Sequence, residues 1–209
     1  MKASHAGRWR RGLYFLTAES SDTHALVLMA GEAIAGGAVM LQYRSKIPDP
    51  ALRRAQAHAL SECALAAGVP LIVNDDVALA LEVGAAGVHL GRGDSSVAQA
   101  RARLGDAAII GASCYDSLAL AVAARAAGAN YVAFGAMYPS ATKPEAITAP
   151  QSLLRESAGL GLPRVAIGGI NLDNAKVLVD AGADLVAVIS AISNASDPRG
   201  VAARFADLF

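Results

Sequence analysis

Residues that could bind phosphate or a metal ion gather in a few short segments of this 209-residue chain. The segment QYRSK, residues 42–46, holds Arg44 and Lys46, and cations that face an anionic ligand form charge-assisted hydrogen bonds with it. Asp75 and Asp94 are hard carboxylates of the kind that Mg²⁺ binds together with water and substrate phosphate. The residue types therefore predict a diphosphate bridged by Mg²⁺. Ion pairs among these four residues, or a solvated loop, are the structural alternative.

A second group of residues near the C-terminus predicts a separate phosphate site. Gly169 follows an apolar run in AIGGI, and Ser190 follows another in VISAIS. Backbone amides just ahead of a helix bind anions, and glycine allows a ligand to approach the backbone closely. Two such sites at one opening would suit two phosphorylated reactants, or one reactant with a phosphate at each end. The alternative is that the glycine pair only makes a tight turn.

Other reactive side chains are weaker candidates. Cys114 stands beside Ser113, but His89 is the one histidine that follows a neighbouring apolar run, so we expect a buried thiol rather than a nucleophile. His89 itself is left open between a place in the pocket and a hydrogen bond within the wall of the fold. Asp76 precedes the helical segment VALALEVG and is expected to cap it, whereas Asp75 is assigned to the metal.

The elements that must position these residues repeat along the chain. A stretch rich in Ala and Leu, then Gly, then a short apolar run recurs, and strands that alternate with helices imply a parallel sheet with right-handed crossovers. Eight apolar runs in about 200 residues predict a single (β/α)8 TIM barrel. The predicted strands are 13–17, 38–43, 70–73, 86–90, 108–112, 130–135, 163–168 and 184–189. An open Rossmann or flavodoxin sheet is the alternative, which the absence of G-x-G-x-x-G after the first run disfavours.

In such a barrel the active site lies at the C-terminal rim of the strands, and the polar candidates follow the predicted strands at that end. If 38–46 is extended throughout, alternation places Gln42, Arg44 and Lys46 on one face that rises into the mouth. We expect residues 1–11 to be an N-terminal tail and 12–209 to be the barrel domain.

Composition excludes several classes of protein. The 18 basic and 18 acidic residues cancel, so the basic field that non-specific nucleic-acid binding needs is missing. The apolar stretches are far shorter than the roughly 20 residues that span a bilayer, and Leu13 to Leu16 is too short for a signal-peptide core. We therefore expect a cytoplasmic protein, with Cys63 and Cys114 as free thiols.

The motifs QYRSK, VNDDVALA, GVHLGRGD, GAS, YVAFGAMYPSATK, AIGGI and AVISAIS, in this order and at these spacings, resemble the thiamine-phosphate synthase family. The resemblance runs from about Leu13 to the C-terminus. Members of that family join 4-amino-2-methyl-5-hydroxymethylpyrimidine diphosphate to a thiazole phosphate and release pyrophosphate. The resemblance implies a transferase of thiamine biosynthesis that forms a C–N bond by dissociative displacement, with Mg²⁺ as cofactor, two small-molecule substrates and no protein nucleophile.

The resemblance also implies a role for each matched residue. The catalytic residues at the reacting end would be Ser113 and Lys143. The pyrimidine diphosphate would be bound by Gln42, Arg44, Lys46, Asn74, Ser113 and Lys143. The thiazole phosphate would be bound by Ser140, Thr142, Gly169, Ile189 and Ser190, and Mg²⁺ by Asp75 and Asp94.

Three positions depart from the common family pattern. Arg92 stands where Gln is frequent, Ser140 where Thr is frequent, and Tyr115 where His is frequent. Tyr115 argues against a thiazole tautomerase, a relative on the same barrel thought to use a histidine there. A non-catalytic sensor that binds thiazole phosphate could lose Asp75 and Asp94, which this chain keeps. A homo-oligomer stays open, because barrel helices often serve self-association but nothing in the sequence marks a face.

Overall fold

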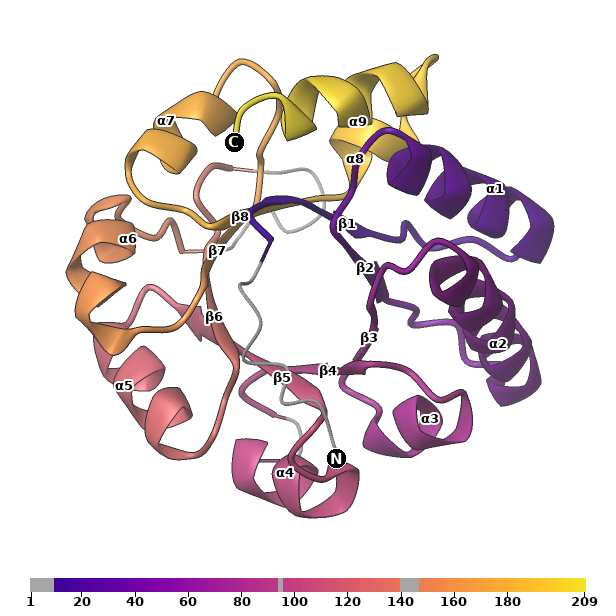
Figure 1. The fold of residues 1–209 in the computed structure, drawn as a ribbon, viewed down its shortest axis with the longest axis horizontal. Coiled ribbons are helices and arrows are strands. Elements are labelled where there is room, and N and C mark those ends of the chain that lie inside the picture. Colours follow the sequence, from indigo (N-terminus) through magenta and orange to yellow (C-terminus); the bar gives the residue numbers. More distant parts are fainter. Residues whose placement is uncertain (1–9, 94–95, 140–146) are drawn as a thin grey trace.

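The structure, a computed structural model, describes residues 10–93, 96–139 and 147–209. Eight parallel strands close into a barrel in chain order, with β8 paired to β1. Figure 1 looks along the barrel, so the strands form an inner ring and the helices an outer one. The predicted (β/α)8 fold is confirmed.

The elements alternate along the described chain. The strands are β1 (Gly12–Leu16), β2 (Met40–Tyr43), β3 (Leu71–Asn74), β4 (Gly87–Leu90), β5 (Ile109–Tyr115), β6 (Tyr131–Phe134), β7 (Arg164–Ile167) and β8 (Leu185–Val188). The helices are α1 (Thr23–Ala35), α2 (Pro50–Ala66), α3 (Val77–Glu82), α4 (Val97–Leu104), α5 (Leu118–Ala126), α6 (Ser152–Glu156), the 3₁₀ helix η1 (Ser157–Leu160), α7 (Ala175–Asp180), α8 (Ser190–Ser193) and α9 (Pro198–Ala206). All eight predicted strands are found, each with ends within one or two residues of the prediction except at β5, which continues three residues further, to Tyr115.

Side-chain caps fix where several helices begin. Asp76 accepts a hydrogen bond from the amide of Leu79 at the start of α3, so its predicted capping role is confirmed. Ser96 at α4 forms a capping box with Gln99. Such caps satisfy amides that have no partner inside the helix and stabilise it by about 1 kcal/mol each.

Two groups of buried side chains hold the barrel together. The larger group fills the space between strands and helices and contains residues such as Leu60, Phe134 and Phe205. The smaller group fills the barrel interior. Its buried members are Tyr14, Leu16, Met40, Ile72, Ile109, Tyr131, Ala133, Val165, Leu185 and Ala187. The barrel interior is therefore a packed core that contains two tyrosines, Tyr14 and Tyr131.

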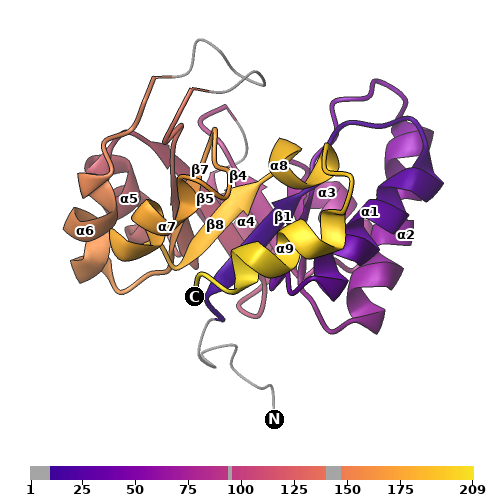
Figure 2. The ribbon, with the colours of Figure 1, turned by 90° about the horizontal axis from the view of Figure 1, so that it is seen from above.

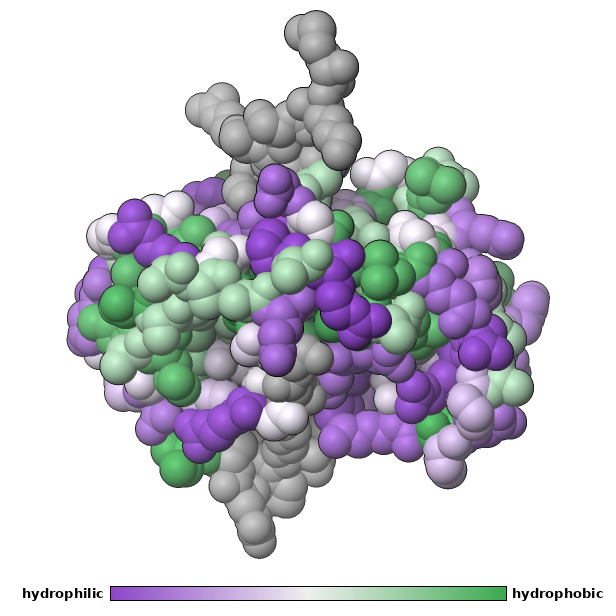
Figure 3. Space-filling view, turned by 90° about the horizontal axis from the view of Figure 1, so that it is seen from below, coloured by the Kyte–Doolittle hydropathy of each residue, from purple (hydrophilic) through white to green (hydrophobic). Residues whose placement is uncertain are grey.

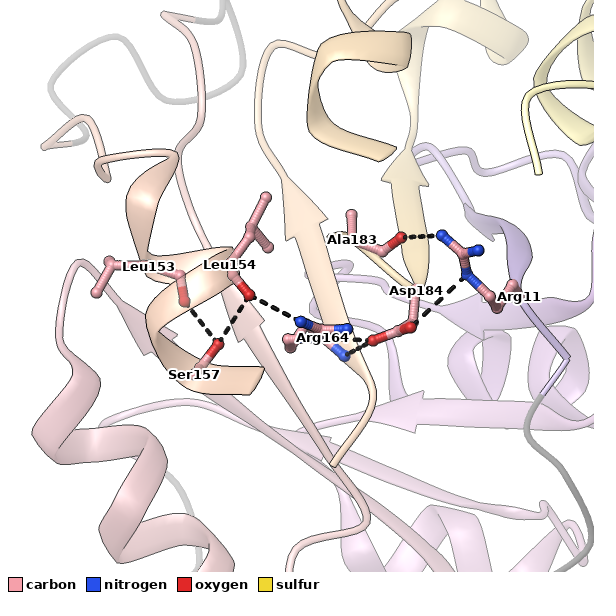
Figure 4. A network of polar contacts seen from close by, with 7 residues as sticks. All are labelled: Arg11, Leu153, Leu154, Ser157, Arg164, Ala183 and Asp184. Atoms are coloured by element: carbon pink, nitrogen blue, oxygen red, sulfur yellow. Dashed lines mark hydrogen bonds and ion pairs between the residues drawn. The ribbon is translucent and has the colours of Figure 1, made fainter. Parts of the chain in front are cut away.

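The end of the barrel where the strands begin is tied together by its own charges, as Figure 4 shows. Arg164 at the start of β7 pairs with Asp184 before β8 at 2.9 Å, and Asp184 also faces Arg11 at 3.7 Å. Arg164 reaches further to the Leu154 carbonyl at 2.9 Å. In Figure 2 the start of β1 and the C-terminus lie on the lower side and α8 on the upper side. Arg164 and Asp184 are thus paired within the fold, and Arg11, expected to belong to a tail, contacts the barrel.

The outer surface shows no single apolar face in the view of Figure 3, where hydrophobic and hydrophilic residues are interspersed. Most of the large exposed hydrophobic residues lie on different helices, and Ile147 lies before α6. Among the described residues they are Leu28, Leu65, Leu81, Val122, Ile147 and Val177. Within the same part of the chain, no helix has the length and apolar character that crossing a membrane requires.

Candidate active site

A cavity of about 400 Å³ opens at the carboxyl ends of the strands. The strands or following loops that line it come from both halves of the barrel, β1, β2 and β4 as well as β5 to β8. The sequence-predicted site residues among its lining are Arg44, Ser113, Gly169, Ile189 and Ser190. The structure thus brings together side chains up to 146 positions apart (190 minus 44). We call this cavity the mouth.

A second cavity of about 400 Å³ lies over β2 and β3. It is lined by Asn74 and Asp75 from the end of β3, by Tyr43 and Ser45 from the end of β2, and by Arg53 of α2. Arg53 pairs with Asp76 at 2.8 Å, so Asp76 is occupied by capping and by this ion pair. The neighbouring carboxylate, Asp75, is exposed.

Asp75 has a backbone conformation that is unusual for a residue other than glycine. Its φ is +63°, and the amide of Asp76 bonds back to the carbonyl of Asn74 at 2.7 Å across it. The amide of Asp75 is anchored on the carbonyl of His89 at 2.9 Å. Residues held in the left-handed region cost of order 1–3 kcal/mol and cluster at ligand sites. These two hydrogen bonds therefore hold the backbone of Asp75 in this conformation at the end of β3.

The cations after β2 differ from the sequence expectation in one respect. The strand ends at Tyr43, so the alternation expected through Lys46 is wrong: Gln42 alone points into the barrel and is 2% exposed. Arg44 is half-buried at the mouth, whereas Lys46 is exposed and lines neither cavity. Among the described residues neither cation forms an ion pair, so the alternative of a pair with Asp75 is not realised.

Thr17 holds the backbone of Arg44 and was missed by sequence reasoning. Its hydroxyl donates to the Arg44 carbonyl at 3.2 Å and accepts from the Arg44 amide at 3.0 Å. The side chain is 2% exposed. A hydroxyl residue directly after an apolar strand was the available signal, because buried hydroxyls need partners.

The loops after β7 and β8, expected on the thiazole side, each place a predicted residue at the mouth. Gly169 has a φ of +65°, and a Cβ there would lie 2.5 Å from the Pro139 carbonyl. Its carbonyl accepts a hydrogen bond from the Asn174 amide group at 3.0 Å. Ser190 begins α8, where the first amides of a helix have no intrahelical acceptor. Gly169 and Ser190 both line the mouth.

Two of the three departures from the family pattern, Arg92 and Tyr115, contact each other. The Arg92 guanidinium lies 4.8 Å from the centre of the Tyr115 ring, and the Arg92 amide donates to the Tyr115 hydroxyl at 3.0 Å. Tyr115 has a φ of +53° and follows an irregularity in the pairing of β5 with β6. Both side chains line the mouth. A cation–π contact of this kind is worth about 0.5–1 kcal/mol at an exposed site.

A chain of hydrogen bonds inside the barrel ends at Ser113. The Gln42 amide nitrogen donates to the Tyr14 hydroxyl at 2.7 Å, and the Tyr14 and Tyr131 hydroxyls are 2.9 Å apart. The Tyr131 hydroxyl is 2.9 Å from Nδ1 of His89, whose Nε2 is 2.8 Å from the Ser113 hydroxyl. The question left open for His89 is thus answered, since it bonds both within the interior and to a residue of the mouth. Burial raises the pKa of Tyr14 and of Tyr131, so both hydroxyls keep their protons near neutrality.

Cys114 faces away from this chemistry. It is fully buried, its thiol donates weakly to the Ala112 carbonyl at 3.6 Å, and burial raises its pKa to about 12. The nucleophile is the thiolate, so the expectation of an unreactive thiol is confirmed. The remaining predicted site residues, Asp94, Ser140, Thr142 and Lys143, lie outside the residues that the structure describes.

Arg44 after β2 and Asp75 after β3, together with glycine-rich and serine-bearing loops after β7 and β8, are typical of a barrel enzyme that acts on phosphorylated small molecules. Comparison with known proteins narrows this class. The sequence profile described as "Thiamine monophosphate synthase" matches residues 13–192. A thiamine-phosphate synthase of Azoarcus sp. (strain BH72) is 52% identical over 200 residues, covering 95% of this chain and 97% of the relative. One from Xanthomonas campestris pv. campestris (strain 8004) is 56% identical over 188 residues, covering 90% of each.

Solved structures agree. The thiamine phosphate pyrophosphorylase of Pyrococcus furiosus superposes with a TM-score of 0.84 at 32% identity, covering 95% of each chain. A 3-hexulose-6-phosphate synthase superposes with a TM-score of 0.70 at 17% identity, which shows the shared fold alone. The chain belongs to the thiamine monophosphate synthase family.

Proposed function

We propose that the mouth couples a pyrimidine diphosphate to a thiazole phosphate, giving thiamine phosphate and pyrophosphate. The observation that carries the proposal is the convergence of two unlike flanks on one opening. Arg44 stands on one flank, and Gly169 and Ser190 stand on the other. One flank suits a departing diphosphate and the other a smaller phosphate held by backbone amides.

The described residues suit distinct parts of a dissociative displacement. Arg44 would neutralise the leaving diphosphate, and Asn74 in the second cavity would orient it. Ser113, on β5 in the lining of the mouth, would contact the reacting pyrimidine. Gly169, Ile189 and Ser190 would hold the thiazole phosphate so that the ring nitrogen meets the methylene carbon. No protein nucleophile is needed, in keeping with the buried Cys114 thiol.

Mg²⁺ fits the donor set at the end of β3. Asp75 offers an exposed carboxylate on a turn fixed by its backbone, next to the Asn74 side chain. The part of the structure described holds no group of three or more His, Cys, Asp or Glu side chains arranged as metal ligands. Mg²⁺ commonly needs only one or two carboxylates, the rest being substrate phosphate and water. When bound, the ion would neutralise charge on the departing diphosphate, and Asp94 is the second carboxylate that we propose for it.

Five further residues complete the proposal from the resemblance alone. Gln42 and Lys46 are assigned to the pyrimidine diphosphate, although Gln42 acts from inside the barrel and Lys46 would have to reach in from the exposed loop. Lys143 is assigned to the reacting end, and Ser140 and Thr142 to the thiazole phosphate. A cytoplasmic location accords with a biosynthetic activity and forms part of the same proposal.

An omission assay tests the proposed function. Purified protein is mixed with both substrates and Mg²⁺, and pyrophosphate and thiamine phosphate are quantified as each component is left out. We expect the two products in equal amounts and neither product without all three components. Conversion of the thiazole phosphate alone would indicate a tautomerase, and binding of it without any turnover would indicate a sensor.

A further inference from the structure

The hydrogen-bond chain in the barrel interior reaches the reacting end of the proposed site from below. It links Gln42 on β2, Tyr14 on β1, Tyr131 on β6 and His89 on β4 to Ser113 on β5. We propose that this chain fixes the direction of the Ser113 hydroxyl proton, which makes Tyr14, Tyr131 and His89 positioning residues. The inference rests on the proposed function only for the identity of the substrate that Ser113 meets.

The direction of the chain follows from its first member. The Gln42 amide nitrogen has protons to donate and no lone pair with which to accept, so the Tyr14 oxygen accepts at 2.7 Å. The Tyr14 proton then needs an acceptor, because a buried donor without one costs about 1–3 kcal/mol. The Tyr131 oxygen at 2.9 Å is that acceptor. The first two bonds therefore both point toward Tyr131.

The same direction continues to the rim. Tyr131, having accepted from Tyr14, donates its own proton to Nδ1 of His89 at 2.9 Å. A neutral imidazole with an accepting Nδ1 carries its proton on Nε2, which donates to the Ser113 oxygen at 2.8 Å. Ser113 is then an acceptor on its inner side, and its proton points into the mouth. There it would donate to a ring nitrogen or a diphosphate oxygen of the pyrimidine substrate.

The surroundings make this chain rigid. Its neighbours in the interior are apolar, among them Leu16, Ile72 and Leu185, and a buried polar chain is tolerated there when its members are satisfied. The three side chains that link Gln42 to Ser113 are nearly fully buried: Tyr14 is 1% exposed, Tyr131 0% and His89 8%.

Gly111 provides the space that the chain needs. It pairs with His89 on one side and with Tyr131 on the other, and a Cβ there would lie 1.9 Å from the Tyr131 ring. With that space open, the His89 and Tyr131 rings stack at 5.5 Å with 19° between their planes. The wall is therefore shaped to bring the tyrosine hydroxyl to Nδ1.

Nitrogen-15 NMR of the imidazole rings tests the direction itself, without substrate. The His89 resonances are identified as those missing from a His89→Asn variant. We expect wild-type His89 in the neutral form with the proton on Nε2, and a larger share of the Nδ1-protonated form in Tyr131→Phe. A wild-type His89 with its proton on Nδ1, or one that Tyr131→Phe leaves unchanged, would overturn the proposal. This result does not depend on what reaction the protein catalyses.

Steady-state kinetics of the proposed reaction test whether the direction of these hydrogen bonds affects turnover. We expect Tyr131→Phe to lower kcat about tenfold, roughly the value of one oriented hydrogen bond, with the KM for thiazole phosphate unchanged. Tyr14→Phe should act in the same sense and serves if Tyr131→Phe does not fold. In a Ser113→Ala background neither substitution should lower kcat further, because the hydroxyl that they orient is gone. Equal losses in both backgrounds would show a merely structural role and reject the proposal.

Ser157→Ala is the matched control for loss of a buried hydroxyl. Ser157 is fully buried and donates to the Leu153 carbonyl at 2.6 Å, near the Arg164 network at the other end of the barrel (Figure 4). We expect it to reduce stability while leaving kcat unchanged. If the wild type forms no thiamine phosphate, the proposed function fails while the NMR experiment still decides the direction of the chain.

Discussion

Alanine substitutions at two glycines with the same φ separate the cost of backbone strain from the role of the loop after β7, which is assigned to the thiazole phosphate. Gly169 and Gly84 both have a φ of +65°, a conformation that costs an alanine about 1–2 kcal/mol. At Gly84 a Cβ would meet nothing within 4 Å, whereas at Gly169 it would lie 2.5 Å from the Pro139 carbonyl and 2.6 Å from that of Tyr138. The comparison of Gly169→Ala with Gly84→Ala therefore isolates the effect of crowding at the mouth.

The expected magnitudes follow from these contacts. Gly84→Ala should lower the free energy of unfolding by about 1–2 kcal/mol through backbone strain alone. Gly169→Ala should lose a further 1–3 kcal/mol or so, since displacing packed backbone costs that much in well-filled sites. Because the loop is assigned to the thiazole phosphate, Gly169→Ala should also raise the KM for that substrate by about tenfold, equivalent to about 1.4 kcal/mol.

Urea unfolding and steady-state kinetics on both variants give the answer. We expect the KM for the pyrimidine diphosphate to change little in either variant, and Gly84→Ala to keep both Michaelis constants. Equal losses of stability in the two variants would refute the steric argument. A Gly169→Ala enzyme whose two Michaelis constants rise by the same factor would refute the assignment of this loop to one substrate.

Three other experiments probe separate features. Asn has about the size of Asp and also tolerates positive φ, so Asp75→Asn should lower turnover roughly a hundredfold through loss of charge alone. Unchanged Mg²⁺-dependent turnover would place the ion elsewhere. A double-mutant cycle of Arg92→Ala and Tyr115→Ala should give a coupling of about 0.5–1 kcal/mol in unfolding, and strict additivity would mean that the contact contributes nothing. The pKa of Cys114 rises on folding from 9.0 to about 12, so the unfolded chain releases this proton more easily and stability is lost as pH rises above 9. Between pH 8 and pH 10.5 the wild type should lose about 2 kcal/mol more than Cys114→Ala, and identical losses would disprove burial of the thiol.

The sequence predicted the fold because its signals are local. Each apolar run is bounded by glycine and by a helical stretch, and these features decide where strands begin and end. The prediction stopped short at β5, where the strand continues through Ser113 to Tyr115 across an irregularity in its pairing with β6. At β2 the predicted strand ends correctly at Tyr43, but the alternation of side chains does not continue to Arg44 and Lys46, because the chain leaves the sheet there.

The same limit explains what was missed in the site. Asp75 and Asp76 could be separated because capping is a local pattern. The interior chain could not be predicted, because Tyr14 and Tyr131 meet across the barrel although 117 positions separate them in the sequence. In isolation each tyrosine looks like an aromatic residue of an apolar strand, and only the closed barrel brings the two hydroxyls together.

The most direct test of the central claim is a pair of crossed calorimetric titrations that asks whether one mouth holds two anions at once. Inorganic pyrophosphate with Mg²⁺ is titrated into the protein with and without saturating thiazole phosphate, and the order is then reversed. If the two flanks are separate, each ligand binds once per chain in the presence of the other, Arg44→Ala weakens only pyrophosphate, and Gly169→Ala weakens only thiazole phosphate. Mutual displacement of the two ligands, or equal weakening of both by either substitution, would contradict the account.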